Sequence, residues 1–187
     1  MLIGIKRKNI KKNNLSFRNF NIEPVAIIGG GVTGASLAFS LKKRNIECFI
    51  VEKGHELGNG ASGNLVAFQM PKLTLDDSIY GIFSLRSYLY SRNLAINLDS
   101  VPISNGVIIF PNRDRENKKF EELLNFKWPY ELFHNYKSVE FQNFKNLHLF
   151  PNSGIVETKN FLKNLSKSVK FINNFEVKKI DHFKNKK

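Results

Sequence analysis

Cysteine is almost absent from this sequence. Its 187 residues include a single cysteine, Cys48. One thiol cannot form an internal disulfide or a cysteine-based metal site, which excludes disulfide-stapled secreted domains and the common zinc modules. The four histidines, His55, His134, His148 and His182, are scattered without metal-ligand spacing. We therefore expect no metal site, and a reducing, cytoplasmic location.

The sequence also lacks a long hydrophobic run. Its longest apolar stretch, residues 25–41, is interrupted by four glycines, one threonine and two serines. Such a stretch is too short and too polar to cross a bilayer. A membrane is therefore not an expected partner.

Acidic residues are scarce, because 16 Asp and Glu stand against 29 Lys and Arg, giving a formal net charge of +13. A basic surface attracts polyanions, RNA included. The abundance of lysine, asparagine, phenylalanine and isoleucine also fits the codon bias of a low-GC genome, so both explanations of the charge stay open. Residues 1–20 hold six basic residues and no acidic one. We interpret residues 1–22 as a solvated basic tail rather than a targeting peptide.

Residues 25–52 have the pattern of a strand, a glycine turn, a helix and a second strand. Residues 25–28 are all apolar, as in a parallel strand that is buried on both faces. A helix is expected over residues 32–44, and Asn45 is a suitable residue to stop it. Residues 47–52 form the second expected strand. The sequence thus predicts an α/β fold that begins with a βαβ unit.

Gly29, Gly31 and Gly34 form the motif G-x-G-x-x-G within this unit. The first glycine permits a tight turn, the second lets the backbone approach a pyrophosphate, and the third allows close packing of helix and sheet. Glu52 ends the second strand, where its carboxylate can accept hydrogen bonds from ribose hydroxyls. This acidic residue disfavours NADP but does not separate FAD from NAD, and a purely structural glycine turn is the alternative. The candidate dinucleotide-binding residues are Gly29, Gly30, Gly31, Val32, Thr33, Gly34, Glu52 and Lys53.

The loop that follows the second strand carries the sequence Gly-Asn-Gly-Ala-Ser-Gly-Asn at residues 58–64. Together with residues 25–52, this loop resembles the D-amino-acid-oxidase-like FAD oxidoreductases. The resemblance implies that the cofactor is FAD and that Ala61, Ser62, Gly63 and Asn64 lie along its pyrophosphate. It also implies that residues 68–70 lie close to the isoalloxazine and that the backbone of Val177 contacts adenine.

A narrower resemblance continues downstream. Residues 61–64, Met-Pro-Lys-Leu at 70–73, Asp-Asp-Ser at 76–78 and Gly-Ile-Val at 154–156 are similar to the FAD half of the bifunctional proteins of tRNA 5-methylaminomethyl-2-thiouridine biosynthesis. That resemblance implies oxidative removal of the carboxymethyl group, as glyoxylate, from a tRNA wobble uridine. It implies tRNA as the substrate and a separate methyltransferase domain or protein as a possible partner. The closing segments of such a domain are not matched, so a domain truncated at its C-terminus is expected.

The remaining pattern indicates helices over residues 79–98, 116–126 and 159–166, the last capped by Thr158. Strands are expected over residues 107–110, 169–171 and 175–180, with short strands within 128–150 and a turn at 154–156. We therefore expect a Rossmann-like FAD-binding domain, residues 23–78 and 154–187, with an inserted α+β substrate domain over residues 79–153.

No catalytic acid or base can be named from the sequence. Asp76 and Asp77 could form a carboxylate pair, but helix capping together with Ser78 is the simpler interpretation. Two other functions stay open. One is a non-catalytic nucleotide-binding remnant or subunit, and the other is an oxidase of small amino acids such as glycine.

Overall fold

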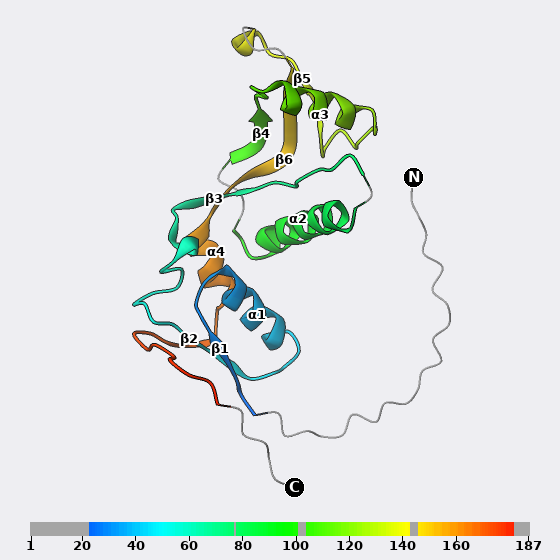
Figure 1. Ribbon diagram of the computed structural model, residues 1–187. Helices are drawn as coiled ribbons and strands as arrows, with labels where there is room; N and C mark the ends of the chain where they lie inside the picture. The colour runs from blue at the N-terminus through cyan, green and yellow to red at the C-terminus, as the bar shows by residue number, and fades with distance from the viewer. Residues whose placement is uncertain (1–22, 77, 101–103, 143–145, 182–187) are drawn as a thin grey trace, which may run out of the picture.

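The computed structural model describes residues 23–76, 78–100, 104–142 and 146–181 (Figure 1). The predicted basic tail, residues 1–22, and Asp77 lie outside this range. Two sheets, one at each end of the molecule, organise the described residues. The fold is a mixed α/β fold, as the sequence predicts.

The first sheet is parallel and contains three strands, β1 (Val25–Ile28), β2 (Cys48–Val51) and β7 (Lys170–Ile172). Their order is β1-β2-β7, so β1 lies at one edge. The helices α1 (Val32–Lys42) and α4 (Thr158–Leu165) contact each other beside this sheet. Ile27, Ile50 and Ala38 form its buried core together with Cys48. Small side chains on α1 allow close packing on both sides, because Ala38 is fully buried against the sheet and Ala35 is fully buried against α4.

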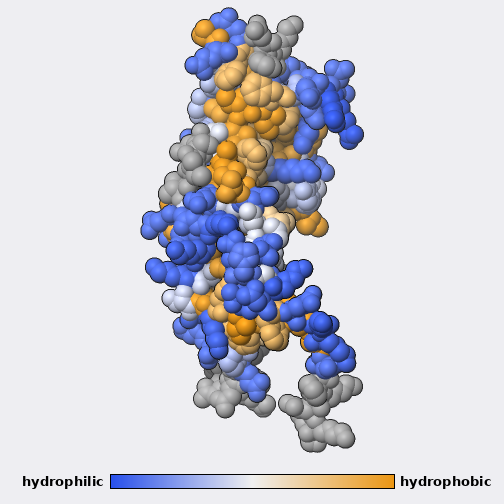
Figure 2. All heavy atoms as spheres, turned by 90° about the vertical axis from the view of Figure 1, so that its left-hand side faces the viewer, coloured by the Kyte–Doolittle hydropathy of each residue, from blue (hydrophilic) through white to orange (hydrophobic). Residues whose placement is uncertain are grey.

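The second sheet is antiparallel. Its order is β3 (Val66–Gln69), β6 (Leu147–Glu157) and β4 (Ser104–Ile109), and β5 (His134–Tyr136) also pairs with β6. Leu73, Leu123, Phe133 and Phe150 form a buried cluster between this sheet and α3 (Asp114–Leu124). Figure 2 shows that apolar residues gather on the surface around this upper part of the molecule.

Local capping signals place the first two helices as predicted. Asn45 adopts a left-handed conformation, with φ of 56°, just after α1. Ser78 begins α2 (Ile79–Asn97), and its hydroxyl accepts a hydrogen bond from the Gly81 N–H. The described helices include none that is both long and apolar enough to span a bilayer.

Three predictions near the C-terminus are wrong. Thr158 is the first helical residue of α4 rather than its cap, and its hydroxyl donates to the carbonyl oxygen of Asn64. Residues 154–156 do not form a turn, because they pair with β3 inside the long strand β6. Residues 175–180 do not form a strand, since they have no sheet partner within the described part of the chain. The short strands expected within residues 128–150 are confirmed as β5 and the start of β6.

His148 is a residue of β6 whose side chain is buried in an aromatic cluster. Its ring stacks on Phe120 and Phe133, with centroid distances of 4.9 and 5.6 Å. Neither ring nitrogen has a hydrogen-bond partner among the described residues. Burial lowers the pKa of His148 below its ordinary value of 6.5, and the negative charge of Glu121 opposes this only in part.

His148→Leu is expected to stabilise the protein by about 1 kcal/mol at neutral pH, because it removes buried polar atoms that lack partners. It should also flatten the pH dependence of the free energy of unfolding. The histidine has a lowered pKa in the folded state, so the wild type loses stability as the pH falls below 6.5. Urea denaturation at pH 7.5 and 5.5 checks both effects. His55→Leu is the matched control, because His55 is exposed. If the free energy of unfolding of His148→Leu changed between the two pH values as much as that of the wild type, the lowered pKa of His148 would be contradicted.

Candidate cofactor site

The glycine turn lies between the C-terminal end of β1 and the N-terminus of α1. Gly29 has a φ of 101°, and its N–H donates to the Val51 carbonyl at 2.8 Å. A β-carbon on Gly34 would lie 1.9 Å from the Gly29 carbonyl oxygen, so α1 packs directly on the turn. The structure therefore confirms the reasons given for the first and third glycines. Together they leave the first turn of α1 facing outward, with N–H groups that have no partner inside the helix and with the positive end of the helix dipole.

Glu52 lies beside this turn, at the end of β2. Its Oε2 accepts a 2.6 Å hydrogen bond from the Gly30 N–H, and its Oε1 accepts a 2.9 Å bond from the Gly54 N–H. These two bonds, chiefly the one from Gly30, hold the pKa of Glu52 below its ordinary value. The group is therefore a carboxylate at neutral pH. Each oxygen keeps a lone pair that can accept a further hydrogen bond from a ligand hydroxyl.

Ser62 approaches the N-terminus of α1 from the loop after β2. Its Oγ accepts a hydrogen bond from the Val32 N–H at 3.1 Å. A β-carbon on Gly31 would lie 3.2 Å from the same oxygen, so a side chain at residue 31 would crowd the serine. Because a hydroxyl that accepts one bond can still donate another, Ser62 can extend the donor set of the helix N-terminus toward an anion.

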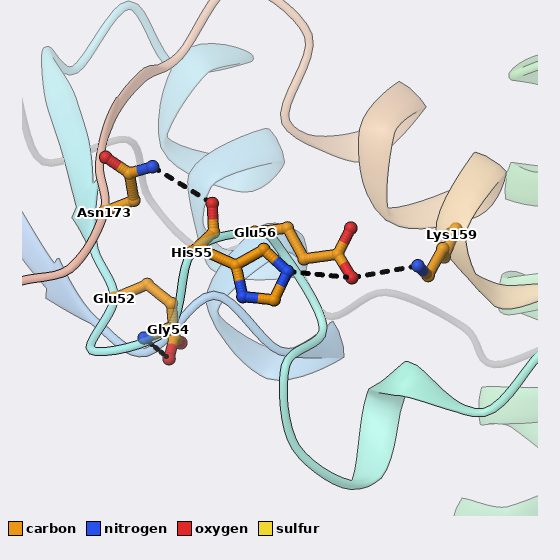
Figure 3. Close-up of polar contacts among 6 residues, drawn as sticks. All are labelled: Glu52, Gly54, His55, Glu56, Lys159 and Asn173. Atoms are coloured by element: carbon orange, nitrogen blue, oxygen red, sulfur yellow. Dashed lines mark hydrogen bonds and ion pairs between the residues drawn. The ribbon is translucent and has the colours of Figure 1, made fainter.

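The loop that carries Ser62 is fixed at several points, some of which Figure 3 shows. Glu56 forms an ion pair with Lys159 of α4 at 2.9 Å, and the Asn173 side chain donates to the His55 carbonyl at 3.0 Å. The Gly58 N–H donates to the Gly30 carbonyl at 2.9 Å. These contacts hold the loop against the glycine turn, α4 and the segment after β7.

Sequence reasoning missed Glu56, Lys159 and Asn173 as residues that position the loop. Each contact joins residues more than one hundred positions apart. No spacing rule connects such residues, because only the folded sheet brings them together.

Two hollows meet at Val32 and Ser62. One, of about 370 Å³, follows the edge of β1 that pairs with no strand among the described residues, and it includes Gly29 and Gly31 in its lining. The other, of about 440 Å³, is mainly apolar and lies between α4 and β3, with Phe68 and Phe161 in its lining. Both volumes are within the usual range for ligand sites. An elongated ligand could therefore pass the N-terminus of α1 and occupy a hollow on each side.

Most of the predicted residues come together around this point. The lining of the two hollows contains Gly29, Gly31, Val32, Thr33, Gly34, Ala61, Ser62 and Asn64. Gly30 and Gly63 lie in the same turns, and the exposed Lys53 follows Glu52. Val177 stands apart, because it lies in the irregular segment after β7 and lines neither hollow. Within the described ranges, no cluster of His, Cys, Asp or Glu could hold a metal ion.

A parallel βαβ unit with a glycine turn, an acidic strand end and an open helix N-terminus is typical of α/β proteins that bind dinucleotides. Comparison with known families narrows this class. The sequence profile of DAO, described as FAD dependent oxidoreductase, matches residues 24–187. The chain belongs to this family of FAD-dependent oxidoreductases.

Two curated relatives carry the name tRNA 5-methylaminomethyl-2-thiouridine biosynthesis bifunctional protein MnmC. The one from a Marinomonas species is 34% identical over 109 residues, which cover 57% of this chain and 16% of that protein. The one from Shewanella denitrificans is 29% identical over 170 residues, which cover 84% of this chain and 22% of that protein. The chain therefore spans less than a quarter of the length of either relative.

A solved structure, the glycine oxidase of Bacillus cereus, is similar in fold with a TM-score of 0.66. The sequence identity is 22%, and the match covers 86% of this chain and 50% of that protein. At this identity the likeness concerns the fold alone.

Proposed function

We propose that this chain is part of an FAD-dependent oxidoreductase that acts in the modification of a tRNA wobble uridine. Membership of the FAD-dependent oxidoreductase family supports the cofactor. The names of the curated relatives support tRNA as the substrate. The single structural observation that carries the proposal is the convergence of Glu52 and Ser62 on the glycine turn and the N-terminus of α1, where two hollows meet.

In this proposal the first turn of α1 and Ser62 hold the pyrophosphate of FAD. Glu52 accepts hydrogen bonds from the adenosine ribose, and Ala61 to Asn64 lead toward the flavin. Phe68, in the lining of the apolar hollow, lies close to the isoalloxazine. The backbone of Val177 approaches adenine from the segment after β7. Lys53 adds positive charge beside the acidic strand end.

The chemistry proposed is removal of the carboxymethyl group from 5-carboxymethylaminomethyl-(2-thio)uridine. When bound, FAD would supply the oxidant by accepting a hydride from the carboxymethyl carbon next to the amine nitrogen, which loses its proton, and hydrolysis of the C=N product would give glyoxylate and an aminomethyl uridine. The residues of this chain bind and orient the cofactor for that step. The proposal includes a cytoplasmic location and a separate methyltransferase domain or protein as a partner.

The proposed domain division is a cofactor-binding unit, residues 23–78 and 154–187, and an inserted substrate unit, residues 79–153. It implies a cofactor unit built from two separate parts of the sequence. The pairing of β7 with β2 supports this arrangement. The boundaries follow the sheets only approximately, because β3 and the end of β6 pair in the second sheet.

Titration with FAD tests the cofactor part of the proposal. The protein is expected to quench flavin fluorescence on binding, and Ser62→Ala should weaken the affinity about fivefold because one hydrogen bond to the phosphate is lost. Ser87→Ala, an exposed serine of α2, is the matched control. A protein that takes up no FAD would favour the non-catalytic remnant.

A glyoxylate assay tests the reaction. With tRNA that bears the carboxymethyl group, the FAD-loaded protein is expected to release glyoxylate and leave an aminomethyl uridine. Free glycine is the control substrate. Turnover of glycine without turnover of the tRNA would support the small amino-acid oxidase instead.

A further inference from the structure

The segment from α4 to β7 is strongly basic. Residues 158–172 contain four lysines and no acidic residue. The helix α3 is a useful contrast, because residues 114–124 contain three basic and four acidic residues. A general bias toward lysine affects both segments, so it does not explain why only one of them lacks acidic residues. The positive charge of the α4–β7 segment is therefore not compensated within the segment.

Lys163 and Lys167 belong to this segment and line the same hollow, and we call them the lysine pair. Lys163 lies in the last turn of α4, and Lys167 follows the end of that helix. Their hollow, the lysine hollow, has a volume of about 430 Å³ and lies beside β2 and β7. Lys159 of the same helix is paired with Glu56, whereas neither member of the lysine pair forms an ion pair with the described residues. Two ammonium groups are therefore available to an anion.

The lysine hollow combines these charges with an apolar floor. Leu57, Val169 and Phe171 line it, and all three pack on the core of the parallel sheet. Ser168 is exposed and also lines the hollow, where its hydroxyl can donate a hydrogen bond. The described lining contains no acidic residue. A ligand with an anionic group and a flat apolar body fits this site.

A nucleotide of single-stranded RNA has both of these features. Its base can turn out and lie against apolar or aromatic side chains while lysines contact its phosphates. The tRNA wobble uridine lies in the single-stranded anticodon loop, so such nucleotides surround it. Another protein element is a poorer match, because covering two unpaired ammonium groups removes their hydration without returning an opposite charge. Charge and shape together therefore favour RNA.

The helix α4 connects the lysine hollow with the candidate cofactor site, and it lies between the two sheets (Figure 1). Thr158 and Phe161 of α4 line the apolar hollow, and Lys163 lines the lysine hollow. The helix has 8 residues and is therefore about 12 Å long. RNA that is held by the lysine pair keeps a nearby nucleotide within reach of the apolar hollow.

We propose that the lysine hollow binds a nucleotide of single-stranded RNA, with the phosphate at the lysine pair and the base against the apolar floor. This inference rests on the proposed function for the choice of RNA as the partner. The lysine hollow shares no lining residue with the two hollows at the cofactor site. Replacement of the lysine pair is therefore expected to leave FAD binding unchanged.

Fluorescence anisotropy of a labelled, unmodified tRNA transcript, titrated with the full chain at several salt concentrations, tests the proposal. The double variant Lys163→Gln/Lys167→Gln is expected to weaken binding about tenfold at about 0.1 M salt. It should also reduce the magnitude of the slope of log affinity against log salt by about 1.5, because each lost phosphate contact removes about 0.7. Lys118→Gln/Lys137→Gln is the matched control, since it removes the same charge from two exposed lysines outside the hollow.

A second readout needs no substitution and is therefore insensitive to misfolded variants. Acetic anhydride acetylates accessible lysines, and mass spectrometry measures the modification of each one. Bound tRNA is expected to slow the acetylation of Lys163 and Lys167 and to leave that of Lys118 and Lys137 unchanged. Equal protection of all four lysines would contradict the proposal.

Other outcomes separate this inference from the proposed function. Equal losses of tRNA affinity in the two double variants would overturn the inference, because binding would then depend on net charge alone. Displacement of the tRNA by poly-L-glutamate as readily as by single-stranded RNA would overturn it as well. A protein that binds FAD and releases glyoxylate from tRNA, but whose salt slope does not change in Lys163→Gln/Lys167→Gln, would overturn this inference alone. A protein that takes up no FAD while the lysine pair still carries RNA binding would overturn the proposed function alone.

Discussion

Gly34→Ala is expected to destabilise the protein by about 2–3 kcal/mol and to abolish FAD binding. The added β-carbon would lie 1.9 Å from the Gly29 carbonyl oxygen and 3.3 Å from Cγ2 of Ile27. Backbone atoms cannot rotate away as the end of a side chain can, so α1 must move off β1. That movement also displaces the helix N-terminus that is proposed to hold the pyrophosphate.

Two opposing effects make this substitution informative. Alanine is favoured over glycine in a helix interior by about 1 kcal/mol, which alone would stabilise α1. The contact with Gly29 must outweigh that gain. Urea denaturation and FAD titration measure the outcome, with Gly60→Ala as the control, because a β-carbon there meets nothing within 4 Å. A Gly34→Ala protein as stable as the wild type would show that α1 does not pack on the turn as described.

Glu52→Gln is expected to weaken FAD binding by tenfold to a hundredfold and to lower stability by about 1–2 kcal/mol. The glutamine amide has a single acceptor oxygen, so it cannot accept from both Gly30 and Gly54. One of these N–H groups loses its partner, and the ribose hydroxyls lose a charged acceptor. Glu47→Gln is the matched control, because Glu47 is exposed and lies just before β2.

The pH dependence of the free energy of unfolding under acidic conditions tests the same carboxylate of Glu52. Because the pKa of Glu52 is lowered in the folded state, its contribution is complete above pH 4.5 and is lost as the pH falls below that value. Glu52→Gln should therefore lose less stability than the wild type between pH 5 and 3. If the two proteins lost the same stability between pH 5 and 3, the hydrogen bonds from Gly30 and Gly54 would not stabilise the charged form of Glu52.

The parts of the fold that the sequence predicts well depend on local signals. Asn45 ends a helix through its left-handed backbone, and Ser78 begins one through its side-chain hydroxyl. Both signals involve only residues nearby in sequence, so the sequence is sufficient to identify these helix ends. The glycine turn is equally local. It could be predicted together with the strand before it, the helix after it and the carboxylate that ends the next strand.

The errors concern residues whose partners are distant in sequence. Thr158 has a residue type that caps helices, but its hydroxyl bonds to Asn64, so the helix begins one residue earlier than predicted. β3 was not predicted because its four residues become a strand only when β6 pairs with them. Residues 175–180 have apolar residues suited to a strand. Without a neighbouring strand among the described residues, only the Phe175 N–H bonds to the end of β2, at the Glu52 carbonyl.

The adjacency of β2 and β7 has a consequence for how the chain folds and diversifies. Val51 pairs with Ile172, and the entire second sheet is synthesised between them. During translation, β1 and β2 are therefore synthesised long before β7, the third strand of their sheet. Once that strand is in place, lengthening the intervening segment costs little, since each doubling of a closed loop adds only about 0.6 kcal/mol of entropy. Mutation can therefore enlarge or reshape the intervening lobe while the three-stranded sheet keeps its geometry.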